Sequence, residues 1–285
     1  MAVDALSAAL RALSFIALFQ AIGIVLFVSM FGRHLTASAE PVRRIGFASA
    51  LVGMVLLLGQ YALEAARMSG DFSGVMDPSM QGLVLHSSAP TVLVLRLLGL
   101  LLIAIALRVR SERRRTALGE GAVFAIVSFA LMGHTVTNPQ RWLLAAMLLA
   151  HLVVAAFWFG ALIPLYLASK RERPEVAATV AAAFSAVAVW LVPVLFVVGL
   201  VLAIFIVKSL AGLRTTYGAL LLAKVTGFAL LMGLAALNKW RLGPALGRGD
   251  ARIAATFQRS LALEYALIAA VLSVTAVMTS WYSPE

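Results

Sequence analysis

His151 interrupts a long apolar run between Trp142 and Ala168, where it stands between Ala150 and Leu152. On a helix it shares a face with Met147, four residues earlier, and with Trp158, seven residues later. At a rise of ~1.5 Å per residue it lies roughly 13 Å along that helix from Trp142. Ionisable groups at such depth are costly and usually face the interior of a bundle. A hydrogen bond to a neighbouring helix would explain His151, but the nearby thioether of Met147 favours a metal ligand.

His134 ends the preceding apolar run, in the sequence Met132-Gly133-His134-Thr135. The short connection that follows makes the two helices antiparallel neighbours, so His134 and His151 can share one interface at different depths. A pair arranged in this way suits a relay of ligands better than one closed site. The alternative is a histidine at the membrane surface that is satisfied by water.

Three possible ligands at the end of another apolar run, Gln60, Glu64 and Met68, are spaced four residues apart and therefore share one helix face. A carboxylate inside a membrane span is a candidate functional group. The competing explanation for Glu64 is an ion pair with Arg96 or Lys224, which also fall inside apolar runs. We take Lys224 as the better partner of the two.

The connection from Arg67 to Pro90 adds Met76, Met80 and His86. Thioether and imidazole ligands together suit Cu(I), whereas carboxylate and imidazole together accommodate Cu(II) or zinc. The chain contains no cysteine, which excludes disulfides, thiolate metal sites, c-type haem attachment and cysteine nucleophiles. Any metal must therefore be bound by histidine, methionine, carboxylate or backbone atoms. By contrast, we expect Glu264 to pair with a nearby arginine rather than to move protons.

The elements that position these residues are apolar helices. Of the 285 residues, 62% are hydrophobic and 12% are charged, whereas a soluble domain has about 25% charged residues. An ordinary soluble enzyme is thereby excluded, and runs of this length can cross a hydrocarbon core of ~30 Å as helices. We predict an all-α polytopic membrane protein, a bundle of eight transmembrane helices in one domain, residues 1–285. The predicted spans are Leu6–Phe31, Ile45–Ala66, Thr91–Val109, Leu118–Thr135, Trp142–Ala168, Phe184–Val207, Tyr217–Leu237 and Ser260–Trp281.

Two halves follow from this division: four helices over about 1–135, with the 67–90 connection as an outer loop, and four over about 136–285. That loop is expected to include a short interfacial helix near Met80–Leu85.

The basic residues predict the orientation of the bundle. Sixteen of the 23 lysines and arginines fall in one set of alternate connections, and five fall in the other. The positive-inside rule then puts both termini outside, which is the periplasm for the inner membrane of a Gram-negative bacterium. Because most basic residues flank apolar spans, the net charge of +11 indicates a lipid bilayer rather than a nucleic acid as the partner.

The C-terminal half resembles a known family of membrane proteins. The residues that carry the resemblance are Val198-Gly199-Leu200, Thr216-Tyr217-Gly218 with Lys224, Ala236-Leu237-Asn238-Lys239, and Arg259-Ser260-Leu261 with Glu264. In order and spacing they are similar to the CopD family, copper resistance protein D. His151 with Trp158-Phe159-Gly160-Ala161-Leu162 resembles that family's His…Trp-x-Gly-Gly-Leu segment, with Ala161 in place of the second glycine. The resemblance covers roughly His134 to Trp281.

This resemblance implies an eight-helix inner-membrane protein that handles copper, as Cu(I) or Cu(II). The leading hypothesis is a copper importer without an ATPase of its own and without enzymatic activity. Ions would be captured by Met76, Met80 and His86, pass Glu64, Met68 and His134, and reach His151 with Met147. A second hypothesis is a membrane copper-binding protein that receives metal from a periplasmic copper chaperone without translocation. A third, a haem-binding oxidoreductase with His134 and His151 as ligands, is disfavoured by the unequal depths of these histidines.

Overall fold

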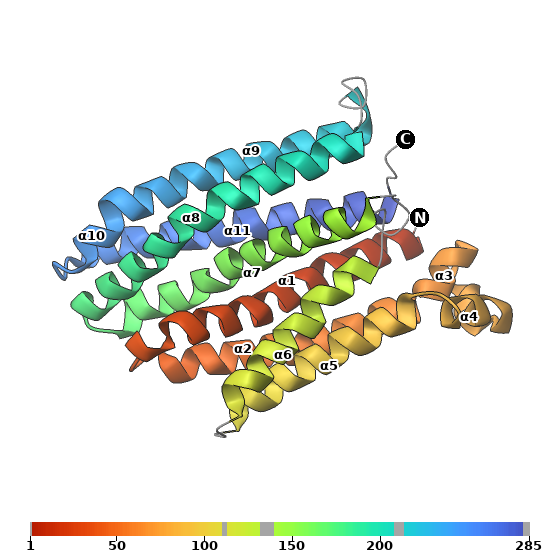
Figure 1. Ribbon diagram of the computed structural model, residues 1–285, viewed down its shortest axis with the longest axis horizontal. Helices are drawn as coiled ribbons and strands as arrows, with labels where there is room; N and C mark the ends of the chain where they lie inside the picture. The colour runs from red at the N-terminus through yellow and green to blue at the C-terminus, as the bar shows by residue number, and fades with distance from the viewer. Residues whose placement is uncertain (1, 110–112, 132–139, 208–213, 282–285) are drawn as a thin grey trace.

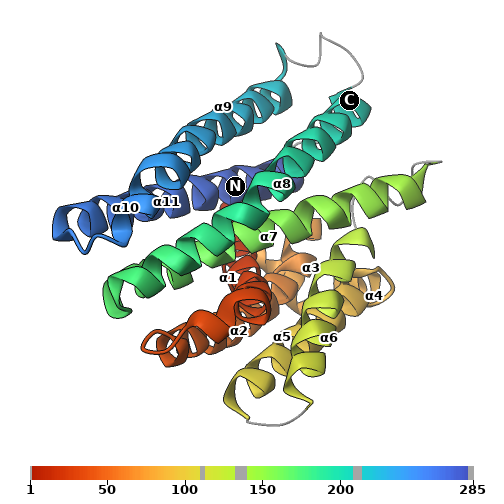
Figure 2. The ribbon, with the colours of Figure 1, turned by 60° about the vertical axis from the view of Figure 1, so that its left-hand side comes forward.

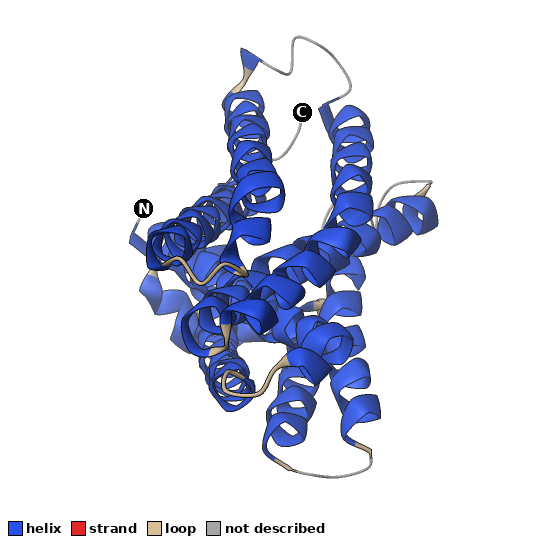
Figure 3. Ribbon diagram, turned by 90° about the vertical axis from the view of Figure 1, so that its left-hand side faces the viewer, coloured by secondary structure: helices blue, strands red, loops and turns tan. Residues whose placement is uncertain are grey.

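A computed structural model describes residues 2–109, 113–131, 140–207 and 214–281 of the chain. Within these ranges the secondary structure is helical, with no strand (Figure 3). The helices run up and down side by side as one long bundle (Figure 1). They comprise α1 (Ala2–Phe31), α2 (Ala39–Ala62), α3 (Glu64–Ser69), α4 (Pro78–Leu85), α5 (Ala89–Arg108), α6 (Arg114–Val127), α7 (Arg141–Arg171), α8 (Pro174–Val207), α9 (Thr216–Leu237), α10 (Gly243–Leu246) and α11 (Ala251–Trp281). Shorter helical turns are η1 (Gly32–His34), η2 (Phe72–Met76), η3 (Ser128–Leu131) and the π-helical turn η5 (Asn238–Leu242).

Seven helices of the described residues are long and apolar enough to cross a membrane. They correspond to seven of the eight predicted spans and confirm a multi-pass helical protein. The fourth predicted span, Leu118–Thr135, corresponds to α6 and η3, and the structure describes it only as far as Leu131. The eighth crossing therefore stays a prediction.

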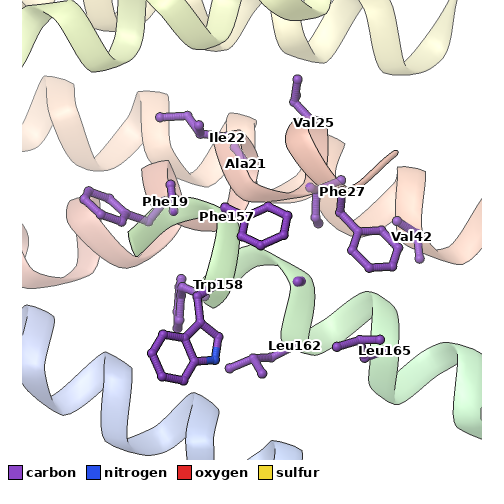
Figure 4. Packing of buried hydrophobic residues seen from close by; sticks show 14 of the residues in the cluster. Phe19, Ala21, Ile22, Val25, Phe27, Val42, Phe157, Trp158, Leu162 and Leu165 are labelled. Carbon is purple, nitrogen blue, oxygen red and sulfur yellow. The ribbon is translucent and has the colours of Figure 1, made fainter. Parts of the chain in front are cut away.

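Helix α1 lies at the centre of the bundle, where α2, α7 and α11 pack around it. Its crossing with α7 brings the two backbones together at Gly23 and Gly160. A Cβ atom added to Gly160 would lie 2.3 Å from the Cα of Gly23, so only glycine fits there. Small residues of this kind allow close helix packing inside a membrane. Figure 4 shows the apolar core on both sides of this crossing, including Phe19 and Ile22 of α1 and Leu162 of α7.

Helices α8 and α9 are peripheral by comparison. Helix α8 packs mainly on α7, and α9 packs mainly on α11. The two meet through the stacked rings of Phe196 and Phe228, whose centroids are 5.4 Å apart. Towards the end of the bundle that holds the termini they spread apart (Figures 2 and 3). Helix α8 carries exposed Trp190, Val197 and Ile204, and α9 carries exposed Leu222, Val225 and Leu230, as expected for helices in contact with lipid.

The two ends of the bundle differ in charge. The termini of the described chain lie at one end, which we call the termini end (Figure 1). The connections α1–α2, α5–α6, α7–α8 and α9–α11 lie at the other end, which we call the basic end because it carries the larger set of lysines and arginines. Apart from Arg110, which lies outside the described residues, the folded topology thus gathers the basic residues of these alternate connections at a single end.

A carboxylate joins two of the connections at the basic end. Glu172, between α7 and α8, accepts four hydrogen bonds from the backbone N–H and hydroxyl groups of Thr36 and Ser38, at 2.5 to 2.9 Å. Partial burial acts to raise the pKa of Glu172, but these hydrogen bonds outweigh it and lower the pKa to about 2. Glu172 therefore holds the α1–α2 and α7–α8 connections together as an anion.

At the termini end, α3, η2 and α4 form an excursion that packs against α1, α2 and α5. Asp71 caps η2 and Asp77 caps α4 by accepting hydrogen bonds from the backbone N–H of Ser73 and Ser79, which satisfies donors that lack a partner within a helix. The position of α4, Pro78–Leu85, confirms the short helix expected near Met80–Leu85.

Candidate functional site

His151 lies on α7 and faces α8. Its Nδ1 atom is 3.2 Å from the backbone carbonyl oxygen of Leu195. Because a carbonyl can only accept, Nδ1 must carry the hydrogen, and the neutral ring then presents an unprotonated Nε2. Histidines that bind metals are typically held in this way, with the second ring nitrogen donating to a carbonyl or carboxylate. The orientation of the His151 imidazole is therefore compatible with metal binding through Nε2.

Gly199 gives the imidazole its access to that carbonyl. A Cβ atom added to Gly199 would lie 3.0 Å from Cε1 and 3.4 Å from Nδ1 of His151. Leu195 and Gly199 are one turn apart on α8, so the missing side chain leaves a notch directly beside the acceptor. The interface between α7 and α8 is thus shaped around the His151 ring.

Two further side chains belong to the surroundings of His151. Met147 is partly buried one turn earlier on α7, so its thioether shares the helix face of the imidazole. Lys224 on α9 interacts electrostatically with His151. A protonated lysine cannot bind copper and repels a metal cation. Lys224 therefore acts as a local positive charge beside the candidate ligands.

The ion pair expected between Glu64 and Lys224 was wrong. Glu64 Oε1 instead lies 3.4 Å from Arg67 Nη2 on the next turn of α3, and Arg11 of α1 also interacts with Glu64 electrostatically. Helix α3 packs against α1 and α2, whereas Lys224 is on α9, across the bundle (Figures 1 and 2). Helices α3 and α9, which carry the two side chains, lie on different sides of the bundle.

The row of Gln60, Glu64 and Met68 predicted on one helix face is divided between α2 and α3. Helix α2 ends at Ala62 and α3 begins at Glu64. Gln60 turns inward and accepts a hydrogen bond from the Ser14 hydroxyl at 3.2 Å, whereas Met68 is 50% exposed. The row therefore does not form one continuous line of ligands.

The outer residues lie apart from His151. Met76 is 86% exposed, His86 is exposed and Met80 is partly buried, all on the excursion that contains η2 and α4. This excursion and the α7–α8–α9 region lie on different sides of the bundle (Figures 1 and 2). His134 lies outside the described residues. The structure thus brings His151 and Met147 together on one face and leaves the outer soft ligands exposed at the termini end.

No group of three or more histidine, aspartate or glutamate side chains that could hold a metal occurs in the part of the chain that the structure describes. Methionine sulfur is a ligand of a different class, suited to Cu(I). The candidate ligand set is therefore one imidazole with thioether, rather than a closed cage of imidazoles and carboxylates.

Sequence reasoning missed a second group of polar side chains, which lies further along the same face of α7 toward the basic end. The Trp158 indole Nε1–H donates to Glu264 Oε2 at 3.1 Å, and Asn238 Nδ2 donates to Glu264 Oε1 at 2.5 Å. Figure 4 shows the Trp158 ring extending from α7 toward α11. Seven residues separate His151 from Trp158, or about 10 Å of helix.

Glu264 is 2% exposed and binds these two neutral donors in place of the expected arginine. One signal was present in the sequence, because Trp158 shares a helix face with His151. The partners on α11 and η5 are brought in only by the tertiary fold.

Comparisons with known proteins show what the chain is similar to. Residues 178–278 match the family model described as copper resistance protein D, and residues 1–139 match copper resistance protein D-like, N-terminal domain. Copper resistance protein D of Pseudomonas syringae pv. tomato is 30% identical over 306 aligned positions, which cover 99% of this chain and 98% of that protein. No solved structure matches the chain significantly.

Proposed function

Because the chain belongs to the copper resistance protein D family and thus has a role in copper handling, we propose that it imports copper ions across the bacterial inner membrane. In this proposal eight helices cross the membrane, both termini face the periplasm and the basic end faces the cytoplasm. The uneven distribution of lysine and arginine supports this orientation. Copper moves from the termini end to the basic end without an ATPase, and the chain catalyses no reaction.

The observation that carries the proposal is the orientation of His151. Its Nδ1–H donates to the Leu195 carbonyl, which leaves Nε2 as a metal ligand within the membrane. Met147 supplies a thioether on the same face. A site built only from these two ligands is incomplete, and incomplete coordination allows an ion to leave as well as to enter. Copper is the cargo of this site rather than a resident cofactor.

Capture begins at three soft ligands of the termini end, Met76, Met80 and His86, of which Met76 and His86 are exposed, and Met68 follows them. We propose that they accept copper from a periplasmic chaperone, since Met76 is 86% exposed. Glu64 and His134 belong to the same proposed entry region. Exposed thioether and imidazole groups bind Cu(I) in preference to hard cations.

Copper uptake into proteoliposomes tests the import proposal. We expect the wild-type protein to fill vesicles that contain a copper-sensitive dye, and His151→Ala to remove most of that uptake. His34→Ala is the matched control, because His34 lies in η1 at the basic end and should leave uptake unchanged. Equal uptake by wild-type and protein-free vesicles would refute the proposal.

A second candidate function is copper binding and delivery at the outer face without translocation. The exposure of Met76 and His86 at the termini end favours it. It predicts stoichiometric copper that stays accessible to a chelator that cannot cross the membrane. Import predicts instead that a fraction of the copper becomes protected from that chelator with time.

A further inference from the structure

Glu264 is a buried carboxyl group without an ion pair in the described ranges. Helix α11 packs against α1, α7, α9, η5 and α10. The charged or titratable side chains on these neighbours include Arg11 on α1, His151 and Tyr166 on α7, Lys224 on α9, and Lys239 and Arg241 in η5; α10 carries none. None of them acts on the carboxyl group, whose polar contacts are with Trp158 and Asn238.

These two contacts accommodate both protonation states of the carboxyl group. The indole N–H of Trp158 can only donate, so Oε2 accepts from it in either state. The amide of Asn238 can donate through Nδ2 to a carboxylate, or it can turn over and accept through Oδ1 from a carboxylic acid. In the structure Oδ1 of Asn238 is buried and has no hydrogen-bond partner among the described residues. A proton on Oε1 would therefore find an acceptor by one rotation of the Asn238 amide.

The backbone around Asn238 is unusual as well. Asn238 begins the π-helical turn η5, which follows α9 directly. Single π-helical turns within α-helices occur frequently at functional sites. Here the wider turn brings a side chain from the end of α9 against a carboxyl group at the middle of α11. A π-helical turn is less favourable than a regular α-helical turn, so its presence here is consistent with a functional role of Asn238.

Ser260 extends the polar region toward the basic end. It lies one turn before Glu264 on the same face of α11 and is 4% exposed. Thr256, Ser273 and Thr275 on α11 satisfy their hydroxyl groups by donating to the carbonyl four residues earlier. The Ser260 hydroxyl makes no such bond and has no partner in the described part of the chain. It remains available to exchange a proton with Glu264 or with water from the basic end.

We propose that Glu264 binds and releases a proton inside the membrane. The proton resides on Oε1, Asn238 accepts from it by turning its amide, Trp158 holds Oε2 in place, and Ser260 lies on the route to the basic end. Resting on the import function proposed above, this proton site couples copper passage to proton movement. The His151 level and the Glu264 level then serve the metal and the proton separately, about 10 Å apart along α7.

Infrared difference spectroscopy of the full-length protein in lipid, between mildly acidic and mildly alkaline pH, tests the proton site. We expect the carbonyl band of a protonated carboxylic acid to appear on acidification and to be absent from Glu264→Gln. Glu64→Gln is the matched control, because it removes another carboxyl group from a membrane span and should keep the band. Glutamine matches the shape of the protonated acid and can hydrogen-bond to both partners, so the fold should survive the substitution.

Trp158→Phe supplies an independent assignment of the infrared band to Glu264, which can be used even if Glu264→Gln fails to fold. Loss of the indole N–H removes a hydrogen bond to Oε2 and should shift the frequency of the same band. The proposal is overturned if no band depends on Glu264, or, where only Trp158→Phe folds, if no band shifts.

The two proposals can fail separately. The infrared measurement needs no copper, so a titrating Glu264 in a protein that takes up no copper would leave the proton site intact and refute import. A pH-sensitive dye in the copper-uptake vesicles tests the coupling. We expect proton movement with wild-type copper uptake and none with Glu264→Gln; copper uptake in wild type without proton movement would overturn the coupling.

Discussion

Replacing Gly199 by alanine isolates the orientation of His151 from the stability of the fold. The new Cβ would lie 3.0 Å from the Cε1 atom of His151, so the ring must tilt away from the Leu195 carbonyl. Losing one neutral hydrogen bond costs about 0.5–1.5 kcal/mol, whereas alanine in place of glycine within a helix contributes about 1 kcal/mol. These terms nearly cancel, and the free energy of unfolding should change by less than about 1 kcal/mol.

Copper binding should nevertheless fall, because loss of the partner that orients a metal-binding histidine typically costs about 10–100-fold in metal affinity. Affinity is measured by competition with a copper chelator, and stability by thermal unfolding in the same detergent. Gly233→Ala is the control, since a Cβ there meets no atom within 4 Å, and it should leave copper binding unchanged. Unchanged copper affinity in Gly199→Ala would refute the assignment of His151 as an oriented ligand.

Three further substitutions test other parts of the account. Gly160→Ala places a Cβ against the backbone of Gly23 and should destabilise the α1–α7 crossing by about 1–3 kcal/mol in thermal unfolding; an unchanged midpoint would contradict this packing. Glu172→Gln should have a lower free energy of unfolding than wild type at neutral pH, because the lowered pKa of Glu172 stabilises the fold while the carboxylate is ionised. This difference in stability should shrink as the pH falls from 4.5 to about 2. A difference independent of pH would contradict the role of the Glu172 anion in holding the two connections together. Lys224→Met removes a positive charge beside His151 and should tighten copper binding several-fold in chelator competition; weaker binding would show that Lys224 instead positions a ligand.

The sequence predicts the helices well. Apolar runs mark where the spans lie, and the interruption by His151 marks a side chain that faces a neighbouring helix, because an ionisable group within a span must avoid lipid. The Val198-Gly199-Leu200 segment carried part of the family resemblance, but only the structure shows that Gly199 makes room for the imidazole. The spans and the interruption by His151 can be read from neighbouring residues in the sequence, or from the spacing of residues on one helix face.

Partners across the bundle were not predictable in the same way. Glu64 and Lys224 both fall in predicted spans, but the position along a span does not fix the direction in which a residue points, and Glu64 is paired with Arg67. Glu264 was expected beside an arginine, yet its donors come from Trp158, 106 positions earlier, and from Asn238 in a π-helical turn. Which helix lies beside which, and where a helix widens, depends on tertiary packing such as the Gly23–Gly160 crossing.

The central claim is that His151 binds copper through its imidazole within the membrane. X-ray absorption at the copper edge of the copper-loaded, full-length protein tests it most directly. We predict scattering from an imidazole ligand together with sulfur in the wild type and in His34→Ala, and loss of an imidazole contribution in His151→Ala. A spectrum of His151→Ala identical to that of the wild type, at equal copper content, would contradict the claim.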